Sequence, residues 1–162
     1  MNFTYRKFKP DDRKAILNVL NYYVKNSFAA YPQEQLESGH FDKLFEAADK
    51  LPFYVIFKGE KLIGFGLLRP YYKLSTFKHT VEITYFILPD YTMKGLGSKL
   101  LNLLEEDARK LGIESILANI SSQNPQSINF HMKYGFVQCG RFEKVGKKFG
   151  KSFDVIWMQK FL

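Results

Sequence analysis

Residues 87–98 constrain the fold most, because they join a strand to a helix through a glycine loop. They follow the apolar, β-branched run 80–88 and open directly into the leucine-periodic segment 95–111. This order leaves unpaired backbone N–H groups at the positive end of the helix dipole, which suits a pyrophosphate. Gly95 and Gly97 lack a Cβ, so a ligand can approach the backbone closely. The stretch therefore predicts a binding site for a phosphorylated cofactor.

Length, charge and cysteine usage bound the classes of protein that remain. The 162 residues fit one domain with a sizeable core, so we expect a single domain over residues 1–162. The net charge of +8 favours an anionic partner, but the lysines are dense only over residues 144–151, which weighs against a nucleic-acid face. No apolar run approaches the ~20 residues of a membrane span. With one cysteine, Cys139, and no signal peptide, we expect a cytoplasmic protein without a membrane partner.

Hydrophobic periodicity and turn residues predict the order β-α-α-β-β-β-α-β-α-β-β. The expected strands are 2–8, 53–57, 62–68, 80–88, 113–120, 136–145 and 152–161. A first helix is expected to begin at Pro10, and three more are expected over residues 40–51, 95–111 and 124–134. Both faces of strand 80–88 are largely apolar, so it should lie centrally and be covered on both sides. The simplest packing is an α/β fold (an α+β mixed sheet) of about seven strands with helices on both faces.

The glycine loop resembles the acetyl-CoA loop of the GNAT N-acetyltransferase superfamily, which reads Q/R-x-x-G-x-G/A. Residues 92–97 are Thr-Met-Lys-Gly-Leu-Gly, with Thr92 in the place of Gln or Arg. A closer resemblance, to the phosphinothricin and methionine sulfoximine acetyltransferase branch, covers most of the chain and is weakest over residues 31–46. The segments that carry it are 21–27, 78–82, 124–131, 135–136 and 145–155. It implies a GNAT-like acyl-CoA N-acyltransferase fold, acetyl-CoA as cosubstrate, direct acetyl transfer to an amine and no metal.

The resemblance also implies which residues hold acetyl-CoA. The pyrophosphate is expected to be surrounded by Met93, Lys94, Gly95, Leu96, Gly97 and Ser98. Ile87 would offer backbone groups to the pantetheine arm, as a strand adds to a splayed sheet edge. Asn124 would hydrogen-bond the same arm. Because Asn also favours helix N-caps, Asn124 can fill both roles.

Glu82 and His131 are the candidate catalytic residues. An alkyl amine has a pKa of about 10, so transfer at neutral pH needs a general base. The branch assigns this role to the glutamate that matches Glu82; the alternative is a structural glutamate that pairs with a neighbouring lysine or caps a loop. His131 stands where most GNAT members carry a tyrosine thought to protonate the thiolate, and where the branch has histidine. Since a thiol pKa of about 8.5 already makes a fair leaving group, we expect His131 to be secondary. It can position substrate, or be a hydrogen-bonded surface histidine.

The acceptor side is predicted from the basic, aromatic connection 69–78. Tyr72, Lys73 and Lys78 flank the central strand and are the candidate substrate-binding residues, with Arg69 at the end of the preceding strand. A cationic segment beside the base suits a carboxylate or phosphinate. Phe28 and Tyr31 are candidates for the pocket wall. The alternatives are a solvated loop for any single lysine and core packing for each aromatic ring.

The sequence thus predicts an acetyl-CoA-dependent N-acetyltransferase acting on a small amino-acid-like amine of the phosphinothricin or methionine sulfoximine type. A second interpretation is a GNAT enzyme that acetylates a protein N-terminus, a lysine or a polyamine, although the positive charge disfavours polyamines. From another class, a basic nucleic-acid-binding module stays open. A Rossmann site is disfavoured, because the glycine loop follows the fourth strand rather than the first. The resembled branch is commonly dimeric, which implies a homodimer.

Overall fold

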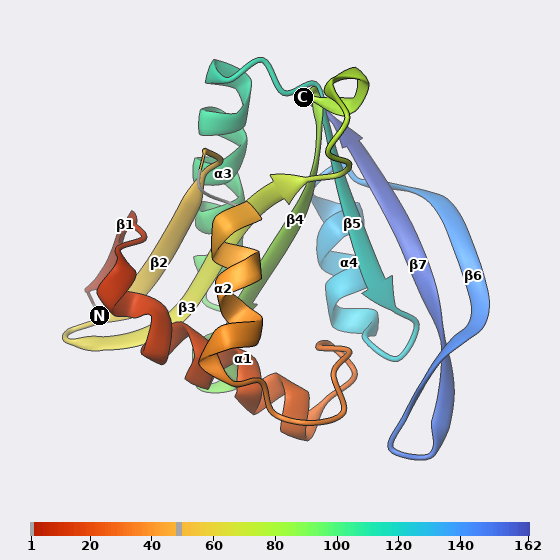
Figure 1. The fold of residues 1–162 in the computed structure, drawn as a ribbon, viewed down its shortest axis with the longest axis horizontal. Helices are drawn as coiled ribbons and strands as arrows, with labels where there is room; N and C mark the ends of the chain where they lie inside the picture. Colours follow the sequence, from red (N-terminus) through yellow and green to blue (C-terminus); the bar gives the residue numbers. More distant parts are fainter. Residues whose placement is uncertain (1, 48–49) are drawn as a thin grey trace.

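One mixed sheet of seven strands organises the chain (Figure 1). The computed structural model describes residues 2–47 and 50–162. The strand order is β1-β2-β3-β4-β5-β7-β6. The strands are β1 (Phe3–Lys7), β2 (Phe53–Lys58), β3 (Lys61–Pro70), β4 (Thr80–Ile87), β5 (Ser115–Ser121), β6 (Val137–Lys148) and β7 (Lys151–Phe161). The α-helices of the described residues are α1 (Arg13–Asn26), α2 (Ser38–Ala47), α3 (Leu96–Lys110) and α4 (Pro125–Lys133).

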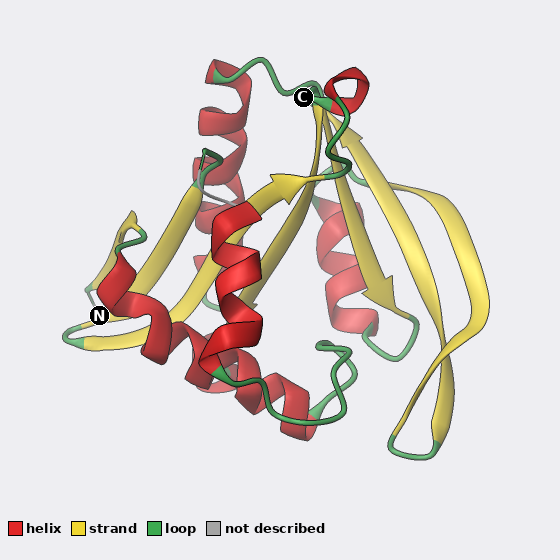
Figure 2. Ribbon diagram, in the orientation of Figure 1, coloured by secondary structure: helices red, strands yellow, loops and turns green. Residues whose placement is uncertain are grey.

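Helices cover both faces of this sheet, as the sequence predicted (Figure 2). On one face, α1 packs on β2 and β3 through a core that includes Ile16, Val24 and Phe65. On the other, α3 packs on β2 and β3 through a core that includes Leu100, Leu104 and Ile56. The predicted helix 40–51 begins at Ser38, and its expected apolar residue Ala48 lies outside the described residues. In the described part of the chain, no helix is long and apolar enough to cross a membrane.

The sheet opens between β4 and β5. These two parallel strands pair only from Thr80 with Ser115 to Glu82 with Leu117, although both strands continue further. Beyond that point β5 keeps its antiparallel pairing with β7 up to Ser121. In Figure 1 the two strands lie close at the top and diverge toward the bottom, with α4 behind the opening. The sheet is thus two arms joined at the start of β4, and we call the opening between them the splay.

The last hairpin is longer than the sequence predicted. Residues 146–150 were expected to connect two strands, but pairing continues to Lys148 with Lys151, and Phe149 and Gly150 form the turn. The glycine at 146 misled the prediction because it serves close packing within β6. A Cβ built there would lie 2.2 Å from the ring of Phe153. Leu111, expected on the buried face of its helix, is 54% exposed because α3 ends one residue before it.

Candidate active site

Glu82 is the last residue of β4 that pairs with β5 before the splay. Its cross-strand neighbour on β3 is Arg69, and Arg69 Nη2 lies 2.6 Å from Glu82 Oε2. From β5, Asn119 Nδ2 donates to the same oxygen at 3.2 Å. Among the described residues, no group donates a hydrogen bond to Oε1 of Glu82. The carboxylate is therefore anchored through one oxygen, and its cationic partner is an arginine rather than a lysine.

On the opposite face of β4, the half-buried Tyr85 and the buried His131 form a hydrogen-bonded chain. The Tyr85 hydroxyl lies 2.6 Å from His131 Nε2, and His131 Nδ1 lies 2.7 Å from the carbonyl oxygen of Ser127. Because a carbonyl only accepts, Nδ1 carries the proton and Nε2 accepts from the tyrosine. Burial lowers the pKa of His131, although its bond to the Ser127 carbonyl acts the other way. The imidazole is thus neutral, and both of its nitrogens are engaged.

The two candidate catalytic residues are not brought together as a pair. Strand side chains alternate between faces, so Glu82 and Tyr85, three residues apart, point in opposite directions. His131 is 3% exposed, and its Nε2 hydrogen-bonds to Tyr85 of β4. The tyrosine was missed as a polar partner, although the pattern of β4 puts its hydroxyl on an otherwise apolar face. Burial raises the pKa of Tyr85 well above its ordinary value, so the hydroxyl keeps its proton.

The glycine loop has the backbone geometry of an anion cradle. Gly95 precedes α3 with a φ of +76°, and Met93 has a φ of +60°. A Cβ built on Gly95 would meet only Ser98 Oγ, at 4.0 Å, so the space over the loop is open. The first N–H groups of α3, from Leu96 onward, have no partner within the helix. Lys94 lies exposed, and its Nζ donates to the carbonyl of Asp90 at 2.7 Å.

The other cofactor candidates line the splay near this loop. A Cβ on Gly97 would lie 3.4 Å from the ring of Phe130 and 3.9 Å from Ile87 Cδ1, so Gly97 faces the space between β4 and α4. The hydroxyl of Tyr23, which no sequence signal marked, donates to the carbonyl oxygen of Ile87. Asn124 caps α4 as predicted, because its Oδ1 accepts from Ser127 N–H at 3.2 Å.

An aromatic cluster lies on the same face of the sheet as Glu82. Phe153 of β7 packs against Phe28 and Tyr31 of the α1–α2 loop, with ring centroids 5.7 Å and 5.6 Å away. Burial and, after it, the negative charge of Glu82 raise the pKa of Tyr31 to about 12, which puts this phenol within electrostatic reach of the carboxylate. We call Phe28, Tyr31 and Phe153 the aromatic wall.

The other candidates for acceptor binding do not belong to the aromatic wall. Tyr72, Lys73 and Lys78 lie exposed on the connection between β3 and β4. Tyr72 is 57% exposed, and its ring meets Phe77 edge-on at 5.5 Å. Among the described residues, neither lysine forms an ion pair. The described residues also contain no group of three His, Cys, Asp or Glu side chains that could hold a metal ion.

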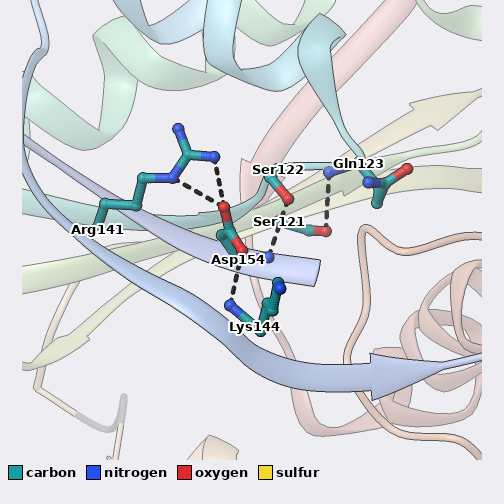
Figure 3. Close-up of polar contacts among 6 residues, drawn as sticks. All are labelled: Ser121, Ser122, Gln123, Arg141, Lys144 and Asp154. Carbon is teal, nitrogen blue, oxygen red and sulfur yellow. Dashed lines mark hydrogen bonds and ion pairs between the residues drawn. The ribbon is translucent and has the colours of Figure 1, made fainter. Parts of the chain in front are cut away.

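Asp154 fastens the β6–β7 hairpin beside the splay (Figure 3). Its backbone N–H donates to Ser122 Oγ at 2.9 Å, just after β5 ends. Its carboxylate accepts from Arg141 Nε at 2.8 Å and from the backbone N–H of Lys144 at 2.7 Å. The second contact holds a bulge in β6, where residues 143–145 stand opposite Asp154 alone. Beyond this bulge, the tip of the hairpin contacts the α1–α2 loop through Lys148.

This fold and site define a class of acyltransferase. The chain matches the model of the Acetyltransferase (GNAT) family over residues 17–136. It is 31% identical over 150 residues to the L-methionine sulfoximine/L-methionine sulfone acetyltransferase of Salmonella typhimurium, covering 91% of this chain and 88% of that protein. The chain belongs to the GNAT family and is an N-acetyltransferase.

Two solved structures extend the comparison. A GNAT superfamily phosphinothricin acetyltransferase from Sinorhizobium meliloti, in complex with AcCoA, superposes with a TM-score of 0.93 at 25% identity, covering 100% of this chain and 89% of that chain. A ribosomal-protein-alanine N-acetyltransferase from Brucella melitensis superposes with a TM-score of 0.90 at 28% identity, covering 98% and 99% of the two chains. The fold is therefore shared by enzymes that are named for different acceptors.

Proposed function

We propose that this enzyme transfers the acetyl group of acetyl-CoA to the amine of a small amino acid of the phosphinothricin or methionine sulfoximine type. The observation that carries the proposal is the Glu82 carboxylate, held by Arg69 and Asn119 where β4 leaves β5. The similarity to a methionine sulfoximine/methionine sulfone acetyltransferase and to a phosphinothricin acetyltransferase supports the same class of acceptor. The acceptor amine would enter from the Glu82 face, beside the aromatic wall.

The splay and the glycine loop fit acetyl-CoA. Backbone N–H groups at the start of α3 would bind the pyrophosphate over Gly95, and Lys94 is close enough in sequence to turn toward it. The pantetheine arm would run past Gly97 between β4 and α4, with Asn124 beside it. Because Tyr23 already occupies the carbonyl of Ile87, we assign the arm to the N–H of Ile87. Acetyl-CoA supplies the thioester that the acceptor amine attacks.

In this mechanism Glu82 takes the proton that the acceptor ammonium must lose. Its Oε1 atom receives no hydrogen bond from the described residues. We therefore assign the proton to Oε1, while Oε2 stays bound to Arg69 and Asn119. The thiolate needs little help to leave, because its conjugate acid has a pKa of about 8.5. His131, neutral and hydrogen-bonded at both nitrogens, is then a positioning residue that orients Tyr85 across the splay.

Arg69 supports an acceptor that carries a carboxylate. Its Nη2 holds Glu82, while its Nε is buried without a hydrogen-bond partner in residues 2–47 and 50–162. The Arg69 side chain as a whole is 36% exposed, so its outer guanidinium N–H groups can bind an acceptor carboxylate. The same guanidinium would then hold both the base and the acceptor. This arrangement favours free amino acids over amines that lack an anionic group.

A thiol-release assay with acetyl-CoA tests the acceptor class. The panel contains methionine sulfoximine, phosphinothricin, methionine, simple neutral amines, a polyamine and peptides that begin with alanine. We expect the highest kcat/KM for the amino acids that carry a second polar tetrahedral group. A clear preference for the peptides would instead assign the enzyme to protein N-termini.

The cofactor site is tested separately through Gly97. Gly97→Glu would put a carboxylate into the space between β4 and α4 that the pantetheine arm is proposed to follow, and we expect it to abolish the thermal shift that acetyl-CoA causes. Gly97→Ala is the matched control, because its Cβ would sit 3.4 Å from the Phe130 ring and requires only a small adjustment. An undiminished shift in a folded Gly97→Glu variant would contradict this path for acetyl-CoA.

A further inference from the structure

Lys148 is the most deeply buried charged side chain of the described residues, at 1% exposure. Its Nζ donates to the carbonyl oxygens of Ser27 and Ala30, at 2.7 Å and 2.5 Å. No carboxylate of the described residues pairs with it. The contact joins the tip of the β6–β7 hairpin to the loop that follows α1, across 121 residues of sequence.

Burying an ammonium group without a carboxylate partner is costly, and this burial lowers the pKa of Lys148. Part of the cost is offset because Ser27 is the C-cap of α1, where the helix dipole favours a cation. The ring of Phe149 adds a cation–π contact at 4.9 Å from Nζ to the ring centroid. An apolar side chain of the same length would fill the space without this cost. What the lysine adds over such a side chain is its two hydrogen bonds to the carbonyls of Ser27 and Ala30.

Those two hydrogen bonds hold the segment that carries the aromatic wall. The carbonyls of Ser27 and Ala30 flank Phe28, and Tyr31 follows directly. The rings of Phe28 and Tyr31 both pack against the ring of Phe153. The ring of Phe153 in turn lies against the backbone of β6 at Gly146. The hairpin thus supports this loop through a polar contact and an aromatic one.

Phe149 gives independent support, because its backbone has an unfavourable conformation while its ring contacts the same loop. Its φ is +51°, a left-handed conformation for which a two-residue hairpin turn usually selects Asn, Asp or Gly. Its ring meets Phe28 edge-on at 5.4 Å between centroids. A turn residue chosen only for stability would not be phenylalanine. Two neighbouring residues of the hairpin tip therefore accept a cost and contact the same segment.

We propose that Lys148 is a positioning residue for the acceptor: it fixes residues 27–31 so that the aromatic wall faces Glu82 at the distance the substrate requires. This inference rests on the proposed function, because it needs an acceptor that binds between the wall and the carboxylate. Lys148 itself touches neither substrate. Its loss should therefore impair acceptor binding and leave the acetyl-CoA site, on the other side of the splay, intact.

Lys148→Met tests this, because it keeps the length of the side chain and removes the donors. We expect the KM for the acceptor to rise roughly tenfold, the loss typical of a hydrogen bond to a charged group. The KM for acetyl-CoA and kcat at saturating acceptor should stay close to wild type. Lys147→Met, at the exposed neighbouring position, is the matched control and should change neither constant. Amide hydrogen exchange should accelerate in residues 27–31 of Lys148→Met only.

Phe149→Asn keeps the test decisive if Lys148→Met does not fold. Asn suits the left-handed turn, so this variant should be at least as stable as wild type, yet raise the acceptor KM by loosening Phe28. An unchanged acceptor KM in a folded variant, or an equal loss of acetyl-CoA affinity, would overturn the positioning role. If wild type acetylates no amine of the panel, the proposed function fails. Unaltered exchange over residues 27–31 in Lys148→Met would separately overturn the claim that Lys148 fixes this segment.

Discussion

The two faces of β4 hold their polar groups in opposite ways. On one face, Glu82 is charged, ion-paired with Arg69 and anchored through one oxygen only. On the other, Tyr85 is half-buried and His131 is buried, both are neutral, and both nitrogens of the imidazole form hydrogen bonds. Only two residues of the strand lie between Glu82 and Tyr85.

This difference separates proton transfer from positioning. A base needs an accessible lone pair and a charge that the site can tolerate, and Glu82 has both. A group whose nitrogens are both occupied cannot accept a proton from substrate without breaking a bond. His131 instead ties α4 on one arm of the splay to β4 on the other. We therefore expect substitutions on the two faces to change different constants.

Breaking the Glu82 face should have the largest effect. Glu82→Gln removes the base but keeps the size of the side chain, and we expect kcat at neutral pH to fall on the order of 10²–10⁴-fold. Part of the loss should return as the pH rises, because more of the acceptor amine is then free. The thermal shift caused by acetyl-CoA should be unchanged. Near-normal turnover at neutral pH would remove Glu82 from the mechanism.

Arg69 sharpens the comparison by testing the acceptor contact of that face. Arg69→Met should lower kcat/KM for amino-acid acceptors by about ten- to a hundredfold, the value of a charge-assisted hydrogen bond. Lys73→Met and Lys78→Met are parallel tests of the exposed cations that the sequence suggested. We expect both substitutions to have smaller effects, limited to the KM for the acceptor, because neither lysine contacts Glu82 among the described residues. A larger effect at either lysine would move the acceptor site onto the β3–β4 connection.

On the opposite face, the Tyr85–His131 bond should matter less for turnover. His131→Ala leaves the Tyr85 hydroxyl buried without its partner, at a cost in unfolding free energy of about 1–3 kcal/mol. Its kcat should exceed that of Glu82→Gln, and His131→Tyr should retain more activity than alanine. A double-mutant cycle with Tyr85→Phe should give a coupling of about 0.5–3 kcal/mol. If alanine at 131 lowers kcat more than Gln at 82 in equally stable proteins, the histidine is the base.

The smallest expected effect is the pH dependence of stability that His131 contributes. Because burial lowers its pKa in the folded state, the unfolded chain binds more protons between that pKa and about 6.5. Stability should therefore fall as the pH drops through this window. Urea unfolding should show a smaller fall for His131→Gln than for wild type, while His79→Gln, at an exposed histidine, behaves as wild type. An equal fall in all three proteins would contradict a buried neutral imidazole.

Local features of the sequence were sufficient for much of the fold. The alternation of β4 assigned Glu82 and Tyr85 to opposite faces, since strand geometry has a period of two. The glycine loop and leucine repeat predicted the entry into α3, and the Asn124 cap required only its own helix turn. Errors came where one residue type serves two purposes: the glycine at 146 looks like a turn residue but lies against Phe153.

What only the tertiary structure decided are the contacts between distant segments. The splay exists because β4 and β5 pair only as far as Glu82 with Leu117, while β5 stays paired with β7 up to Ser121, and no local pattern encodes this pairing. The partners of the candidate site depend on it: Arg69 meets Glu82 through the register of β3, and Tyr85 meets His131 across the opening. Lys148 reaches Ser27 only when the final hairpin folds back over α1. Residue type and periodicity determined each side chain's environment, while the strand order determined its partner.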